Sequence, residues 1–136
     1  MEINRSVSGI SHKSLEALVE AVNREKRIFC DGVGRSRLKA EGFAMRLIQM
    51  GFTALVVGEA TTPAITRDDM LLICSASGET PMLVEHAAKA KKVGAAVMLI
   101  TTSETSSLAV LSDFVITIDA SSKTTRSDAS VQPMGS

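Results

Sequence analysis

The sequence predicts an α/β fold in which a doubly wound, five-stranded parallel sheet is flanked by helices. Apolar runs alternate along the chain with segments of helical periodicity. The runs are continuously apolar, as expected for strands that are buried on both faces of a parallel sheet. The 136 residues, 45% of them apolar, are enough for one domain with a core of ordinary size.

Two helices and two strands are predicted in the first half of the chain. A helix is expected over residues 14–25, where apolar side chains recur at helical spacing. The apolar segment RIFCDGVG that follows is typical of a buried strand that runs into a tight turn. The next helix spans 35–51 and contains Gly42, which costs about 1 kcal/mol relative to alanine, so we expect close packing there. Residues 53–59 predict the second strand.

The second half of the chain continues the alternation. Strands are expected over residues 70–77, 95–103 and 114–119. Between them, the sequence predicts a helix over 81–94, with a proline in its first turn and a glycine at its end. A shorter helix is predicted over 106–113.

Composition and charge limit the class of protein. The formal net charge is zero, so no basic surface is expected to attract nucleic acid or an acidic membrane. The N-terminal segment has no apolar core suited to a signal peptide, and no apolar stretch approaches the ~18 residues of a membrane span, so we expect a cytoplasmic protein. Cys30 and Cys74 lie singly inside apolar runs, which predicts two buried thiols and no metal site. We expect one domain over residues 1–120 and a disordered or loosely held polar tail over 121–136.

The small polar residues of CSASGET separate the third strand from the helix that follows it. Ser75 and Ser77 are expected to end the strand, Gly78 permits a close approach of the backbone, and Thr80 precedes the helix. Ligands bind at the carboxyl ends of the strands in such sheets, and a helix N-terminus favours an anion. Three hydroxyl groups favour a phosphate. The alternative is that Thr80 caps the helix and the two serines only turn the chain.

A second glycine turn, DGVGRSR, follows the first strand. It resembles the start of a dinucleotide-binding fingerprint, but Arg37 stands at the position of the third glycine. Glu59 is only a weak match to the acidic residue of that fingerprint, so no nicotinamide cofactor is expected. The turn instead brings Arg35 and Ser36 to a strand end beside the CSASGET segment.

Together, these segments resemble the SIS (sugar isomerase) domains, and among them the 6-phospho-3-hexuloisomerases. GRS, GFAMRLIQMGF, VVGEATTPAI, SASGET and SVQPMGS look like segments of that subfamily, in its order. The resemblance implies a flavodoxin-like three-layer sandwich. It also implies an isomerase of the ribulose monophosphate pathway, which interconverts D-arabino-3-hexulose 6-phosphate and fructose 6-phosphate through an enediol. No cofactor or metal is expected. The resemblance implies that the chain forms a homodimer or a homotetramer. The alternative is a non-catalytic SIS module that binds or senses a phosphosugar.

The resemblance also assigns roles to residues. The phosphate is expected to bind Ser36, Ser75, Ser77, Gly78 and Thr80. Other contacts to the substrate are expected from Gly34, Arg35 and Glu79. The resemblance implies catalytic roles for Glu59 and Arg46, which match residues that face the sugar, and the position of His86 on its helix adds it as a third catalytic candidate. His86 is a candidate acid or base, and the alternative is an exposed histidine on a helix.

The chain departs from the subfamily in three places. Arg37 stands at a position that is commonly glycine, where it is either strained by a positive φ or adds positive charge near the phosphate. Ala76 stands where a second glycine is common and narrows the predicted phosphate loop. The printed sequence ends at QPMGS, whereas the subfamily continues with LFEQ and a C-terminal helix. A candidate catalytic glutamate lies in that continuation, so we expect a chain that binds the sugar phosphate without this base.

Overall fold

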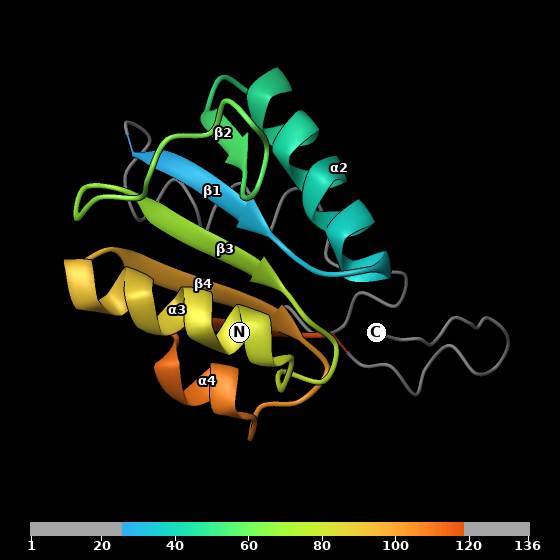
Figure 1. The fold of residues 1–136 in the computed structure, drawn as a ribbon. Coiled ribbons are helices and arrows are strands. Elements are labelled where there is room, and N and C mark those ends of the chain that lie inside the picture. The colour runs from blue at the N-terminus through green and yellow to red at the C-terminus, as the bar shows by residue number, and fades with distance from the viewer. Residues whose placement is uncertain (1–25, 119–136) are drawn as a thin grey trace, which may run out of the picture.

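The computed structural model describes residues 26–118, which form a parallel sheet with helices on both faces (Figure 1). The strands are β1 (Arg27–Asp31), β2 (Thr53–Val56), β3 (Met70–Cys74), β4 (Ala96–Thr101) and β5 (Phe114–Thr117). The helices are α2 (Arg35–Gln49), α3 (Pro81–Val93) and α4 (Ser107–Leu111). The helix predicted over 14–25 and the polar tail predicted over 121–136 lie outside the described residues.

The order of the strands confirms the predicted fold class. All neighbouring strands are parallel, and the order across the sheet is β2-β1-β3-β4-β5. The chain therefore moves outward in one direction from β1 to β2 and in the other from β3 to β5. The order reverses between β1 and β3, where Asp31 is in register with Ile73. The loops that follow these two strands thus meet at the switch point, where ligands bind in such sheets.

The strand side chains alternate between two buried layers. Cys30 lies in the core cluster on the α2 side, with Leu47 of that helix, and Phe29 lies in the other cluster, with Leu83 of α3. Figure 1 shows α3 and α4 together on one side of the sheet and α2 against the other. Fully burying a leucine stabilises a fold by about 2 kcal/mol, so Leu47 and Leu83 fasten their helices to opposite faces.

The ends of the helices follow the predicted signals. Pro81 lies in the first turn of α3, and Gly94 ends this helix with a left-handed φ of 93°. The chain leaves α2 through Gly51, which has a φ of 94°. The prediction of close packing at Gly42 is wrong, because this residue is exposed and, apart from its neighbours in α2, no described atom lies within 4 Å of the position that a Cβ would take there.

Strands β2 and β3 end earlier than predicted, because turns begin early at their carboxyl ends. Strand β2 ends at Val56, and Gly58 turns the chain with a φ of 94°. Strand β3 ends at Cys74, so Ser75 and Ser77 lie in the following loop and not at the end of the strand. The hydroxyl groups of that loop therefore lie beyond the carboxyl end of β3 and not within the sheet.

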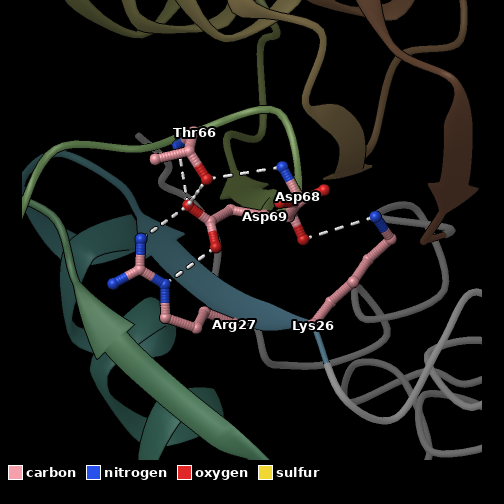
Figure 2. Close-up of polar contacts among 5 residues, drawn as sticks. All are labelled: Lys26, Arg27, Thr66, Asp68 and Asp69. Atoms are coloured by element: carbon pink, nitrogen blue, oxygen red, sulfur yellow. Dashed lines mark hydrogen bonds and ion pairs between the residues drawn. The ribbon is translucent and has the colours of Figure 1, made fainter.

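The amino edge of the sheet holds a closed cluster of polar groups (Figure 2). Arg27 starts β1 and donates from Nε and Nη2 to the two carboxylate oxygens of Asp69, each at 2.8 Å. Asp69 precedes β3, and its Oδ2 also accepts from the backbone N–H (2.6 Å) and the hydroxyl (3.0 Å) of Thr66. The side chain of Asp69 is buried, so these bonds satisfy a carboxylate that is removed from water.

Both cysteines are free and buried, as predicted. Cys30 and Cys74 lie on the neighbouring strands β1 and β3, in the core cluster on the α2 side. Among the described residues, no helix has the length and apolarity needed to cross a bilayer.

Candidate active site

The loop between β3 and α3 is turned by its own serines. Ser75 Oγ accepts from the backbone N–H of Gly78 at 3.0 Å, and Ser77 Oγ accepts from the N–H of Glu79 at 3.1 Å. Such bonds from a serine to the N–H two or three residues ahead are the usual way in which this residue stabilises a turn. Each hydroxyl still has its own proton to donate. Turning the chain and binding a phosphate are therefore compatible roles for the same side chains.

Thr80 does not cap α3 through its side chain. It occupies the N-cap position with an extended backbone, and its carbonyl accepts from Leu83 and Val84, but its hydroxyl makes no capping hydrogen bond. The alternative in which Thr80 serves as a side-chain cap is therefore wrong. Pro81 has no N–H, and those of Leu83 and Val84 donate to Thr80, so the first turn of α3 leaves the backbone N–H of Met82 as its donor for an anion.

The β4–α4 segment fastens this loop from one side. Gly78 has a φ of 72°, and a Cβ there would lie 2.1 Å from Ser106 Oγ, so only glycine fits. The carbonyl of Gly78 accepts from the N–H of Leu108 at 3.0 Å. The carbonyl of Ala76 accepts from the hydroxyl of Thr102 at 2.7 Å. These bonds fix the backbone of the loop before any ligand arrives.

Glu79 also fastens the loop to α4. Its carboxylate accepts from the hydroxyl of Ser107 at 2.6 Å and from the backbone N–H of the same residue at 2.9 Å. These two bonds lower the pKa of Glu79, so the group is a weak base. The prediction that Glu79 contacts the substrate is not tested by this geometry, which shows its carboxylate turned to α4.

The loop after β1 brings a second set of predicted residues to the same edge. A Cβ at Gly32 would lie 2.6 Å from the carbonyl oxygen of Ser36, so the loop folds tightly back on the first turn of α2. Gly34 occupies the N-cap with a φ of 63°. Arg35 is exposed, and Ser36 is buried one residue further along the helix. The two loops of the predicted phosphate site therefore start from neighbouring strands.

Arg37 and Glu59 form an ion pair at the end of β2. Arg37 lies inside α2, so the expected strain of a positive φ does not arise. Its Nη2 donates to Glu59 Oε2 at 2.9 Å, and its Nη1 donates to the carbonyl of Val57 at 2.8 Å. The positive charge expected near the phosphate is thus shared with a carboxylate that was itself predicted to be catalytic.

Arg46 does not join the other predicted residues within this chain. It lies ten residues beyond Ser36 on α2, which corresponds to about 15 Å along a helix that runs away from the carboxyl edge. Its Nε is buried and has no hydrogen-bond partner among the described residues.

His86 has a partner that the sequence analysis missed. Its Nδ1 lies 2.7 Å from Oδ2 of Asp31, the last residue of β1. The side chain of Asp31 is 3% exposed and that of His86 is 30% exposed, so His86 is not the freely exposed helix histidine of the alternative. The signal was present in the sequence, because Asp31 is a polar residue directly after an apolar run, as Ser75 is, and a glycine follows it.

A doubly wound sheet with two small-residue loops at its switch point belongs to the class of α/β domains that bind ligands at the carboxyl edge. The family model described as "SIS domain" matches residues 21–134, so the chain belongs to the SIS domain family. The predicted resemblance to this family is thereby confirmed.

Relatives of known name include two called 3-hexulose-6-phosphate isomerase. The Bacillus subtilis protein is 39% identical, with 99% of this chain and 74% of the relative covered. The Mycobacterium gastri protein is 39% identical, with 90% of this chain and 62% of the relative covered.

Two solved structures show the same fold. MJ1247 from Methanococcus jannaschii, for which the crystal structure inferred the function of a 3-hexulose-6-phosphate isomerase, has a TM-score of 0.71 and 34% identity. That match covers 79% of this chain and 60% of MJ1247. The Vibrio vulnificus protein NanR, solved with ManNAc-6P, has a TM-score of 0.67 and 29% identity. That match covers 79% of this chain and 43% of NanR. The chain thus spans about three quarters of the B. subtilis relative but only 60% of MJ1247.

Proposed function

We propose that the chain is a sugar-phosphate isomerase that interconverts D-arabino-3-hexulose 6-phosphate and fructose 6-phosphate. The observation that carries this proposal is the pair of loops at the switch point, with hydroxyl groups and the start of α3 at one edge of the sheet. The names of the relatives from B. subtilis and M. gastri supply the substrate class and the reaction.

The phosphate would bind to Ser75, Ser77, Gly78 and Thr80, and Ser36 would assist from the neighbouring loop. The β4–α4 segment already fixes the loop, so the loop would lose little conformational entropy when it binds the phosphate. This favours affinity. Phosphate binding would position the substrate, because the phosphate does not take part in the transfer of the proton between C2 and C3. Gly34 and Arg35 would contact the substrate from the β1–α2 loop.

The reaction needs a group that takes a proton from carbon and a group that polarises the carbonyl. The candidates of the sequence analysis were Glu59, Arg46 and His86. Glu59 would have to release its ion pair with Arg37 before its Oε2 could contact the substrate. Arg46 would need the edge of another subunit to reach a substrate, which fits the proposed homodimer or homotetramer. A cytoplasmic location also belongs to this proposal.

A coupled assay tests the function directly. The full chain is incubated with D-arabino-3-hexulose 6-phosphate, and the fructose 6-phosphate formed is measured at high protein concentration. We expect turnover. If the ligand raises the melting temperature but is not converted, the chain is the non-catalytic binding module that was the alternative.

The phosphate site is tested separately with Ser77→Ala. Loss of a hydrogen bond to a charged group costs about 1.5–3 kcal/mol, so the affinity for fructose 6-phosphate should fall about tenfold or more. Ser112→Ala is the matched control, because Ser112 Oγ donates to the carbonyl of Leu108 at the far end of α4. Equal affinities in the two variants would contradict the assignment of Ser77.

A further inference from the structure

A buried carboxylate pairs with a histidine beside the candidate phosphate site, and neither the fold nor the phosphate loop explains why. Asp31 is the last residue of β1, and its side chain is almost fully buried. Among the described residues, its recorded side-chain partner is His86 Nδ1, at 2.7 Å. Burying a carboxylate is costly unless it is paired, and an apolar residue at this end of β1 would avoid that cost.

The contact with Asp31 determines the tautomer and the orientation of the His86 imidazole. An ionised carboxylate only accepts hydrogen bonds, so Nδ1 must carry the proton that it donates to Asp31. The other ring nitrogen, Nε2, then has a free lone pair when the imidazole is neutral. The imidazole is also held in one orientation, since Asp31 lies at the end of a strand and not on a mobile loop. An oriented imidazole with a free Nε2 is suited to accept and return a proton.

The pair lies at the same edge of the sheet as the proposed phosphate site, but apart from the phosphate loop. Asp31 lies directly before the turn that leads to Ser36, and β1 is the neighbour of β3 at the switch point. His86 lies six residues beyond Thr80, or about 9 Å along α3 from the proposed phosphate site. The reacting carbons of a 3-hexulose 6-phosphate are separated from the phosphate by the other carbons of the chain. A proton-transferring group must therefore lie at some distance from the phosphate loop.

We propose that His86 transfers the proton between C2 and C3 and that Asp31 is its positioning residue. This inference rests on the proposed isomerase function. Nε2 takes the proton from C2, and the electrons of that C–H bond form the C2–C3 double bond while O3 becomes an enolate oxygen. The hydroxyl proton of O2 passes to O3. The electron pair on O2 then forms the new carbonyl at C2, and C3 takes the proton back from Nε2. His86 ends the cycle neutral, and no other reactant is consumed.

Kinetics of three variants of the full chain test this role. General acid–base groups contribute about 10²–10⁴-fold, so His86→Ala should lower kcat by about 100-fold or more and leave KM within about twofold. Asp31→Asn should lower kcat by about tenfold or more, because the amide no longer requires the proton on Nδ1. Glu85→Gln is the matched control: Glu85 is the exposed neighbour of His86 on α3, and its substitution should leave both constants unchanged.

Added imidazole separates a chemical role from a structural one. It should restore at least part of the kcat of His86→Ala and have no effect on the wild-type chain, whereas damage to the fold would not respond to it. The proposal is overturned if the wild-type chain turns over and His86→Ala keeps its kcat, or if imidazole restores nothing in a variant that melts like the wild type. If the wild-type chain itself has no activity, the proposed function fails, and this inference fails with it.

Discussion

The two edges of the sheet use polar residues in opposite ways. At the amino edge, Arg27, Thr66 and Asp69 satisfy one another, and the cluster leaves no oxygen of Asp69 without a donor. At the carboxyl edge, Ser75 and Ser77 use an oxygen lone pair to turn the chain and keep their protons. The first arrangement contributes stability, and the second leaves donors for a ligand. Substitutions at the two edges should therefore separate stability from binding.

The largest effect is expected at Gly78. A methyl group there would clash with Ser106 Oγ and would require an alanine at a φ of 72°. Gly78→Ala should lower the free energy of unfolding by about 3 kcal/mol and abolish binding of fructose 6-phosphate. Chemical denaturation and a binding titration measure the two effects.

Gly42→Ala is the control for Gly78→Ala. Apart from its neighbours in α2, no described atom lies within 4 Å of the added methyl group, so this variant should be more stable by about 0.5–1 kcal/mol and bind normally. Normal binding by Gly78→Ala would contradict the account of the loop as a rigid, closely packed turn.

The second-largest effect on stability is expected at the amino edge. Asp69→Ala removes both bonds to Arg27 and leaves the N–H of Thr66 without its acceptor. The free energy of unfolding should fall by about 2 kcal/mol, less than for a fully buried pair because Arg27 is 36% exposed. The KM for the sugar phosphate should stay unchanged, since the cluster is at the opposite edge. A raised KM in a folded variant would contradict the claim that the amino edge contributes to stability and not to substrate binding.

The amino edge should also make the stability depend on pH. Burial alone would raise the pKa of Asp69, but the bonds from Arg27 and Thr66 outweigh it and lower the pKa below the ordinary value. A carboxylate with a lowered pKa contributes stability above the pKa of the unfolded chain, about 3.9, and that contribution is lost as the pH falls further. Denaturation at pH 7 and pH 3 should therefore show a smaller loss in Asp69→Asn than in the wild type. Equal losses would show that other groups cause the acid sensitivity.

The smallest effect on stability is expected at Thr80. Its hydroxyl does not cap α3, so Thr80→Ala should change the free energy of unfolding by less than about 0.5 kcal/mol while weakening binding of the sugar phosphate. Ser106→Ala is the contrasting variant, because Ser106 Oγ accepts from the N–H of Ala109 and caps α4. Its loss should cost about 1 kcal/mol. A Thr80→Ala variant that binds normally would remove Thr80 from the site.

The sequence predicted what depends on local pattern. Continuous apolar runs placed all five strands, and Pro81 and Gly94 marked the ends of α3. The two polar loops could be placed at one edge because parallel strands end on the same side. Strand ends were less accurate, since Ser75 can continue a strand or turn the chain and only its bond to Gly78 decides.

The pairing of side chains could not be predicted in the same way. Asp31 and His86 are 55 residues apart in the sequence, and Glu79 and Ser107 are 28 apart. Nothing local in the sequence links either pair, because each depends on how a helix packs across the sheet. The bonds from Ser107 to Glu79 were therefore not predicted, and Asp31 was overlooked although it ends a buried strand.

The burial of both cysteines has a practical consequence for labelling. Burial raises the pKa of the Cys74 thiol to about 12 and also raises that of Cys30, so neither forms the reactive thiolate at neutral pH. The sequence contains no other cysteine. A fluorophore could therefore be attached through Thr105→Cys, at an exposed position in the β4–α4 segment that holds the loop between β3 and α3. Neither buried cysteine of the core would have to be replaced. The emission of the fluorophore would then report on the loop as ligand binds.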